Sequence, residues 1–203
     1  DAYNVAVGHQ AGLAVTTGIQ NTVVGGRALQ ANTVGLGNVA LGYQAMYTNV
    51  DGSKCVAIGT NALLAQEPAS ALDMYNVAIG YNAGAAITSG IDNTLIGALA
   101  GDAITSSSQN VALGSSALSA LTIGTANVAL GYRTLFASVD GDHNTAVGYK
   151  ALEDYEDGDG NGHNTAIGSK SQLNASTGEF NTSLGSLSMG VGVTTGDYNV
   201  AVG

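Results

Sequence analysis

An acidic, Gly-rich stretch at 153–162 contains the side chains best suited to bind a metal ion. Asp157, Asp159 and Asn161 alternate with other residues and are followed by a Gly, which matches the opening of a calcium-binding loop. The twelfth position of such a loop requires a bidentate Glu, but this chain has Gly168 there. Calcium is thus the one cofactor the sequence points to, and none is required. A solvated acidic loop is the favoured alternative.

Aromatic and imidazole side chains form a second group. Four Tyr residues share the position directly after a recurring Gly: Tyr43, Tyr81, Tyr132 and Tyr149. A row of exposed rings could stack on a glycan, although such rings more often cover a corner of the fold, which is the interpretation favoured here.

His143 and His163 each stand directly before a recurring Asn, which places them about 5 Å apart on adjacent rungs. They predict either a metal pair or, preferably, two histidines in turns. No Ser/His/Asp arrangement and no phosphate-binding loop is evident, so we expect no enzymatic activity.

These residues are positioned by a repeat that runs through the whole chain. A motif of Asn, Val or Thr, usually Ala, a branched aliphatic residue and Gly begins at twelve places, and eight of the eleven intervals are 17 residues long. The motifs start at Asn4, Asn21, Asn38, Cys55, Asn76, Asn93, Asn110, Asn127, Asn144, Asn164, Asn181 and Asn199. Such regularity predicts an all-β, parallel β-solenoid of about twelve rungs, one repeat array spanning 1–203.

Each position of the motif has a physical role. Asn tolerates turns and forms hydrogen-bonded ladders between stacked copies. The Val/Thr and aliphatic positions share one face of a strand, because successive side chains point to opposite faces. The third position is Ala in nine of twelve copies, and the fifth is always Gly. Gly at that position suits a tight corner with positive φ.

The motif strand is apolar on both faces, as in parallel strands that are covered on both sides. We expect the Val/Thr and aliphatic positions to line the solenoid interior and the Ala positions, such as Ala78, Ala112 and Ala129, to face outward. A single-layer solenoid cannot cover an outward apolar stripe by itself, and monomers rarely expose one. The sequence therefore predicts self-association through the Ala positions.

The rest of each repeat is more variable. The second position after the Gly is rich in Arg and Lys and is expected to face water. It is followed by a small residue and often by Leu or Met, and these positions together suggest a second short strand. Two longer intervals predict loop insertions near 64–74, with the only Pro, and near 153–162.

Composition excludes several function classes. Charged residues make up 10% of the chain and hydrophobic residues 45%, which favours a folded array over disorder. The net charge of −10 repels nucleic acid. No apolar run is long enough to insert into a membrane, and no signal peptide is visible. A single Cys excludes an intrachain disulfide framework.

The stretches NTAVGYKAL, starting at Asn144, and NVAIG, starting at Asn76, resemble the head repeats of trimeric autotransporter adhesins. They also resemble repeat arrays of phage tail-fibre proteins, and the likeness covers essentially the whole chain. This resemblance implies a left-handed β-roll, three chains about one axis and an exposed surface role. The chain departs from the adhesins in its longer period and in showing no coiled-coil stalk.

We therefore expect a structural or adhesive fibre module, the shaft or head of an extracellular fibre on a cell or virion surface. Its expected partners are further copies of the chain, as a homotrimer or an end-to-end filament, and a surface glycan or host protein. A carbohydrate-active fibre enzyme would need carboxylates clustered in a groove, whereas most acids here fall in turns. An ice-binding solenoid would need a flat Thr array, whereas the Thr residues here alternate with Val at a position expected to face inward.

Overall fold

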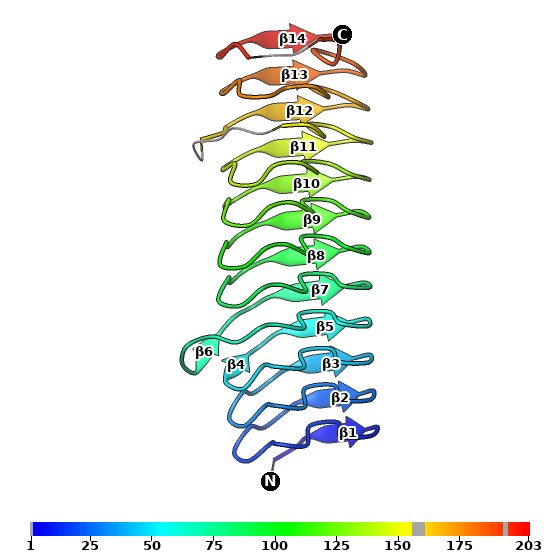
Figure 1. The fold of residues 1–203 in the computed structure, drawn as a ribbon, viewed down its shortest axis with the longest axis vertical. Coiled ribbons are helices and arrows are strands. Elements are labelled where there is room, and N and C mark those ends of the chain that lie inside the picture. Colours follow the sequence, from blue (N-terminus) through cyan, green and yellow to red (C-terminus); the bar gives the residue numbers. More distant parts are fainter. Residues whose placement is uncertain (1, 156–160, 193–194) are drawn as a thin grey trace.

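The computed structural model describes residues 2–155, 161–192 and 195–203 and forms a rod of stacked rungs (Figure 1). No helix occurs among these residues. The strands are β1 (Val5–Val7), β2 (Thr22–Val24), β3 (Val39–Leu41), β4 (Gly52–Ser53), β5 (Val56–Ile58), β6 (Leu72–Asp73), β7 (Val77–Ile79), β8 (Thr94–Ile96), β9 (Val111–Leu113), β10 (Val128–Leu130), β11 (Thr145–Val147), β12 (Thr165–Ile167), β13 (Thr182–Leu184) and β14 (Val200–Val202).

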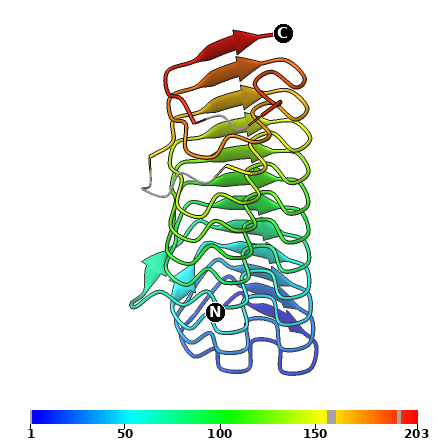
Figure 2. The same ribbon diagram turned by 45° about the horizontal axis from the view of Figure 1, so that its top comes forward.

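Each repeat motif contributes one strand to a single parallel sheet of twelve strands. The strands pair in register, so that Ala129 lies opposite Ala112 on one side and Ala146 on the other. Figure 2 shows the rungs as successive coils of one continuous chain stacked along one axis, with all the motif strands on the same side of the rod. The predicted parallel β-solenoid is confirmed.

The expected orientation of the motif strand is wrong. The Ala position faces the interior, where Ala78, Ala112 and Ala129 are fully buried, and the Val/Thr and aliphatic positions face outward. The reason is steric. The interior is narrow and is already filled from the opposite wall by side chains such as Leu118 and Leu135, which leaves room for little more than a methyl group under the strand.

One departure from the Ala position shows how tightly the interior is filled. Leu95 replaces Ala there, and Gly stands where Leu or Met usually does both in the same rung (Gly101) and in the preceding rung (Gly84). A Cβ added to either Gly would come within 2.9 Å of a Leu95 methyl group. The larger Leu95 side chain thus fills the space that is left by the two Gly residues, which keeps the packing of the interior dense.

The second half of the rung forms turns in place of the expected short strand. Arg27 and Leu29 have φ of 58° and 47°, and Arg133 and Leu135 repeat this left-handed conformation. The backbone there still bonds between rungs, as when the Leu29 amide donates to the Ala45 carbonyl at 2.8 Å. Because the left-handed region costs about 1–2 kcal/mol for each non-Gly residue, stacking is what holds these turns in place.

The recurring Asn residues form the predicted ladder, and it is tied to the backbone. Asn110 is fully buried, and its side-chain oxygen accepts the backbone N–H of Asn127 at 3.0 Å. Its Nδ2 donates to the Gly124 carbonyl at 3.0 Å, and the Asn127 Nδ2 donates to the Asn110 side-chain oxygen at 3.2 Å. Each amide therefore joins the start of a strand to the turn that closes the same coil.

The Gly that ends each motif leaves no space for a side chain. Gly114 has φ of 144°, and a Cβ on it would lie 2.4 Å from the carbonyl oxygen of Gly131 on the next rung. The same contact recurs along the column, for example between Gly97 and Gly114 at 2.4 Å. Adjacent rungs thus approach backbone to backbone at this corner, which explains why only Gly occurs there.

Candidate functional sites: an outward strand face and a hollow beside the first insertion

The outward side of the twelve-stranded sheet is an uncharged, mostly apolar surface, here called the strand face. It consists of the Val/Thr and aliphatic positions of every motif. Its side chains are half-buried along the middle of the rod, and several are exposed, including Leu113 at 49% and Ile167 at 40%. Eleven steps of about 4.8 Å give this surface a length of about 53 Å.

Aromatic side chains border the strand face on both edges. The position before Asn carries Tyr75, Phe180 and Tyr198, and the position after Gly carries the four Tyr residues identified above, all of them exposed. Tyr132 and Tyr149 stack at 5.7 Å between ring centroids. The Tyr rings thus lie in the open at a corner of the rod, where they widen the apolar surface.

The two histidines lie as close as the repeat predicts. The rings of His143 and His163 stack at 4.8 Å, and Phe180 and Tyr198 continue the column at 4.7 and 5.0 Å. The two imidazole planes differ by only 4°. A metal ion lies in the plane of the imidazole that binds it, so parallel rings direct their lone pairs side by side and do not converge on one ion. This arrangement favours the turn interpretation.

The first insertion repairs a gap in the Asn ladder. Cys55 stands where every other motif has Asn, and the next interval carries Gln66, which is fully buried. The Gln66 amide donates to the Asn49 side-chain oxygen at 3.3 Å and to the Cys55 sulfur at 3.4 Å, and it accepts from the Asn76 amide at 3.1 Å. Sequence reasoning missed this role, although the missing Asn directly before an insertion was a signal for it.

The Cys55 thiol is buried and not activated. Burial raises its pKa to about 11 from an ordinary value of 9.0, against weaker opposing hydrogen bonds from Asn76 and Gln66. A thiol with that pKa is almost entirely protonated near neutral pH, so it is a poor nucleophile and a poor metal ligand.

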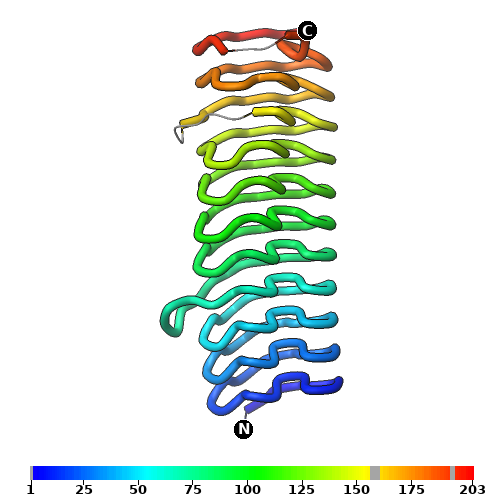
Figure 3. The backbone as a smooth tube through the Cα atoms, in the orientation of Figure 1, coloured from blue at the N-terminus to red at the C-terminus, as the bar shows by residue number. Residues whose placement is uncertain are grey.

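The insertion also builds a small structure outside the shaft. Figure 3 shows the chain between β5 and β7 bulging from the regular outline of the rod. Within this bulge β6 pairs with β4 in parallel, with Leu72 opposite Gly52 and Asp73 opposite Ser53. Between this two-stranded sheet and the preceding rung lies an open hollow, lined by Val34, Leu36, Ser53, Ala71, Leu72 and Asp73.

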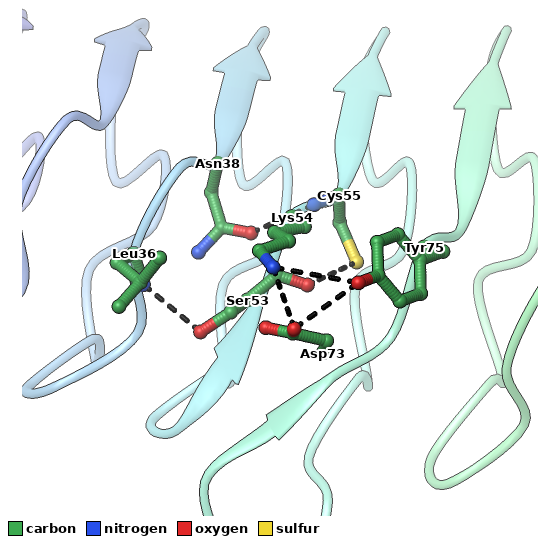
Figure 4. Close-up of polar contacts among 7 residues, drawn as sticks. All are labelled: Leu36, Asn38, Ser53, Lys54, Cys55, Asp73 and Tyr75. Carbon is green, nitrogen blue, oxygen red and sulfur yellow. Dashed lines mark hydrogen bonds and ion pairs between the residues drawn. The ribbon is translucent and has the colours of Figure 1, made fainter.

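Three polar side chains meet beside the hollow (Figure 4). Lys54 Nζ donates to Asp73 Oδ2 at 2.6 Å and to the Tyr75 hydroxyl at 3.4 Å, and that hydroxyl donates to Asp73 Oδ2 at 3.1 Å. The hydrogen bond raises the pKa of Lys54 and lowers the pKa of Asp73, so both side chains stay charged near neutral pH. Sequence analysis did not identify this cluster, because Asp73 lies inside an insertion that has no counterpart in other repeats.

The predicted calcium loop lies in the second insertion. Asp157 and Asp159 fall outside the described residues, whereas Asn161 is exposed and its carbonyl accepts the Tyr155 hydroxyl at 3.2 Å. Within the described ranges, no three His, Cys, Asp or Glu side chains gather as a metal site would require. The calcium loop stays a prediction.

The described part of the chain also contains no helix long and apolar enough to cross a membrane. Comparison of the chain with protein-family models, with curated proteins and with solved structures found no match.

Proposed function

We propose that this chain is the shaft or head module of a surface fibre, extracellular or on a virion, and that it works as a homotrimer whose strand faces pack against one another. The β-solenoid is compatible with a structural repeat protein. The observation that carries the proposal is the strand face itself, which runs unbroken along the rod without a single charged residue.

Charge and symmetry support self-association through this surface. The chain has a net charge of −10, so two copies repel unless they meet on an uncharged area. Every rung presents one Val or Thr and one further Val, Leu or Ile on this face, and burying the half-exposed part of each aliphatic side chain contributes about 1 kcal/mol. A closed arrangement about one axis covers the whole strand face of every copy.

The test compares two charge-matched pairs of substitutions on adjacent rungs. Val111→Lys with Val128→Lys places two charges on the strand face, whereas Ser106→Lys with Ile123→Lys places two on exposed positions elsewhere. Light scattering should give the parent and the second variant three times the 20.1 kDa chain mass, and the strand-face variant the mass of one folded chain. A parent that stays a folded monomer at high concentration would refute the proposal.

A third variant separates the two sides of the strand. Ala112 is fully buried, so Ala112→Glu should unfold its rungs, which circular dichroism would report as lost β-structure. If this variant stayed folded and merely dissociated, the assignment of the outward side would be wrong.

One observation favours a second candidate, an ice-binding surface. Thr145, Thr165 and Thr182 occupy three successive rungs and face outward, contrary to the inward orientation expected from the sequence. Thermal hysteresis of the parent, lost on changing these three residues to Lys, would support this candidate. A trimer that buries the strand face would exclude it.

A further inference from the structure

The geometry points to the hollow beside the first insertion as a binding site for a neutral saccharide. This inference goes beyond the structural role proposed above and does not depend on oligomeric state, because the hollow is built by one chain and lies outside the strand face. It rests on the shape of the hollow, on the unused hydrogen-bonding capacity of two polar side chains and on the charge at its rim.

The walls of the hollow are fixed before any ligand arrives. Its inner wall is formed by Val34 and Leu36 of the regular rung, and its outer wall by Leu72, which is 45% exposed. Pairing of β4 with β6 holds the two walls apart, and the Met74 amide extends that pairing by donating to the Ser53 carbonyl at 3.0 Å. A site of this kind loses little conformational freedom when it binds.

Two polar groups in the hollow have capacity left for a ligand. Ser53 is only 5% exposed, and its hydroxyl accepts the Leu36 amide at 3.0 Å, while the hydroxyl proton has no acceptor in the part of the chain that the structure describes. Asp73 receives both of its side-chain hydrogen bonds, from Lys54 and Tyr75, on Oδ2. Oδ1 is left to accept a further hydrogen bond.

The charges at the rim select an uncharged ligand. Lys54 and Asp73 form an ion pair with no net charge, and the acidic chain around them repels anions. A cation would have to displace Lys54 from the carboxylate. A neutral molecule can instead accept from the Lys54 ammonium group and donate to Asp73 without breaking the pair.

The hollow combines aliphatic walls with a donor, the Ser53 hydroxyl, and an acceptor, Asp73 Oδ1. This combination suits a molecule that has one apolar face and several adjacent hydroxyl groups. A pyranose has this combination, because its ring C–H groups present an apolar face and its hydroxyl groups both donate and accept. The Ser53 hydroxyl would donate to one ring substituent and Asp73 Oδ1 would accept from another.

Saturation-transfer NMR on the full chain tests the site with four probes, the methyl glycosides of glucose, galactose and mannose and that of N-acetylglucosamine. Ser53→Ala and Asp73→Asn should each weaken binding of the preferred glycoside about tenfold, the usual effect of removing one good hydrogen bond in a binding site. Ser106→Ala and Asp92→Asn remove the same groups from exposed positions outside the hollow and should change nothing.

Binding of none of the four glycosides at millimolar concentration would overturn the inference, as would binding that both hollow variants retain in full. Two charged probes test the ligand class. Tighter binding of N-acetylneuraminic acid or of glucosamine than of every neutral glycoside would also overturn it. Light scattering on the same samples reports the oligomeric state separately, so a monomeric parent would refute the trimer while leaving the saccharide result intact.

Discussion

Replacing Gly114 by Ala should destabilise the rod far more than its small size suggests. The added Cβ would lie 2.4 Å from the Gly131 carbonyl oxygen, 2.6 Å from its carbon and 3.1 Å from the Tyr132 amide nitrogen. All three are backbone atoms, and the Gly131 amide is held by the Leu113 carbonyl at 2.8 Å, so they cannot yield without separating the rungs. Strain at φ 144° costs about 1–3 kcal/mol, and each inter-rung hydrogen bond lost costs about 1 kcal/mol more.

The expected loss in the free energy of unfolding is therefore about 3–5 kcal/mol, the sum of one strained residue and two lost hydrogen bonds. Gly37→Ala is the matched control, because its φ is also positive, at 66°, but the nearest atom to its Cβ is Lys54 Cγ at 3.7 Å. That change should cost only about 1 kcal/mol. Urea unfolding followed by circular dichroism compares the two, and equal losses would show that the close approach of the rungs does not restrict this position.

Two further predictions concern the repaired gap in the ladder. Because the pKa of Cys55 is about 11, iodoacetamide at pH 8 should alkylate it about 100-fold more slowly in the native chain than in the unfolded chain. The native rate should rise about tenfold per pH unit up to pH 10. A fast native reaction that does not depend on pH would contradict the buried site. The side chain introduced by Cys55→Asn should collide with Gln66, and Gln66→Ile should remove the amide that Asn49 and Asn76 contact. The double change instead places Asn beside an aliphatic residue, the combination that Asn76 and Ile87 form one rung later. The double variant should recover at least about 1 kcal/mol of the summed losses in unfolding free energy, and strict additivity would show that the two positions are not coupled.

The periodic features of this fold can be predicted from the sequence because they repeat. The spacing of the motifs predicted the parallel β-solenoid, the Asn column predicted the hydrogen-bonded ladder, and the first long interval predicted the insertion between β5 and β7. The Gly column predicted a tight corner, although only the structure shows that the contact is with the backbone of the next rung.

The sidedness of the strand could not be derived in the same way. Both faces of the motif are apolar, so hydrophobicity does not say which one lies inside. The deciding quantity is the width of the interior, which depends on the Leu and Met side chains of the opposite wall, such as Leu118, and hence on how the coil closes. Ala occupies the inner side because a narrow interior filled from the far wall accepts only the smaller side chain.

The candidate sites were the hardest part to foresee. The hollow depends on the pairing of β4 with β6, a contact made by an insertion that occurs only once and therefore has no periodic signal. The stacked column of His143, His163, Phe180 and Tyr198 could be placed from the register, but the parallel orientation of its rings could not.

The backbone hydrogen bonds that join the rungs have a mechanical consequence. In the sheet they run between strands, along the rod axis, so a force that pulls the two ends apart loads them directly. The outermost rung carries this load first and can peel away while the next remains intact, as in unzipping. A rung of 17 residues would release about 60 Å of extended chain in exchange for about 4.8 Å of rod. Each released rung would meet a ready template when the force falls, so a shaft of this construction would yield in steps and recover its length.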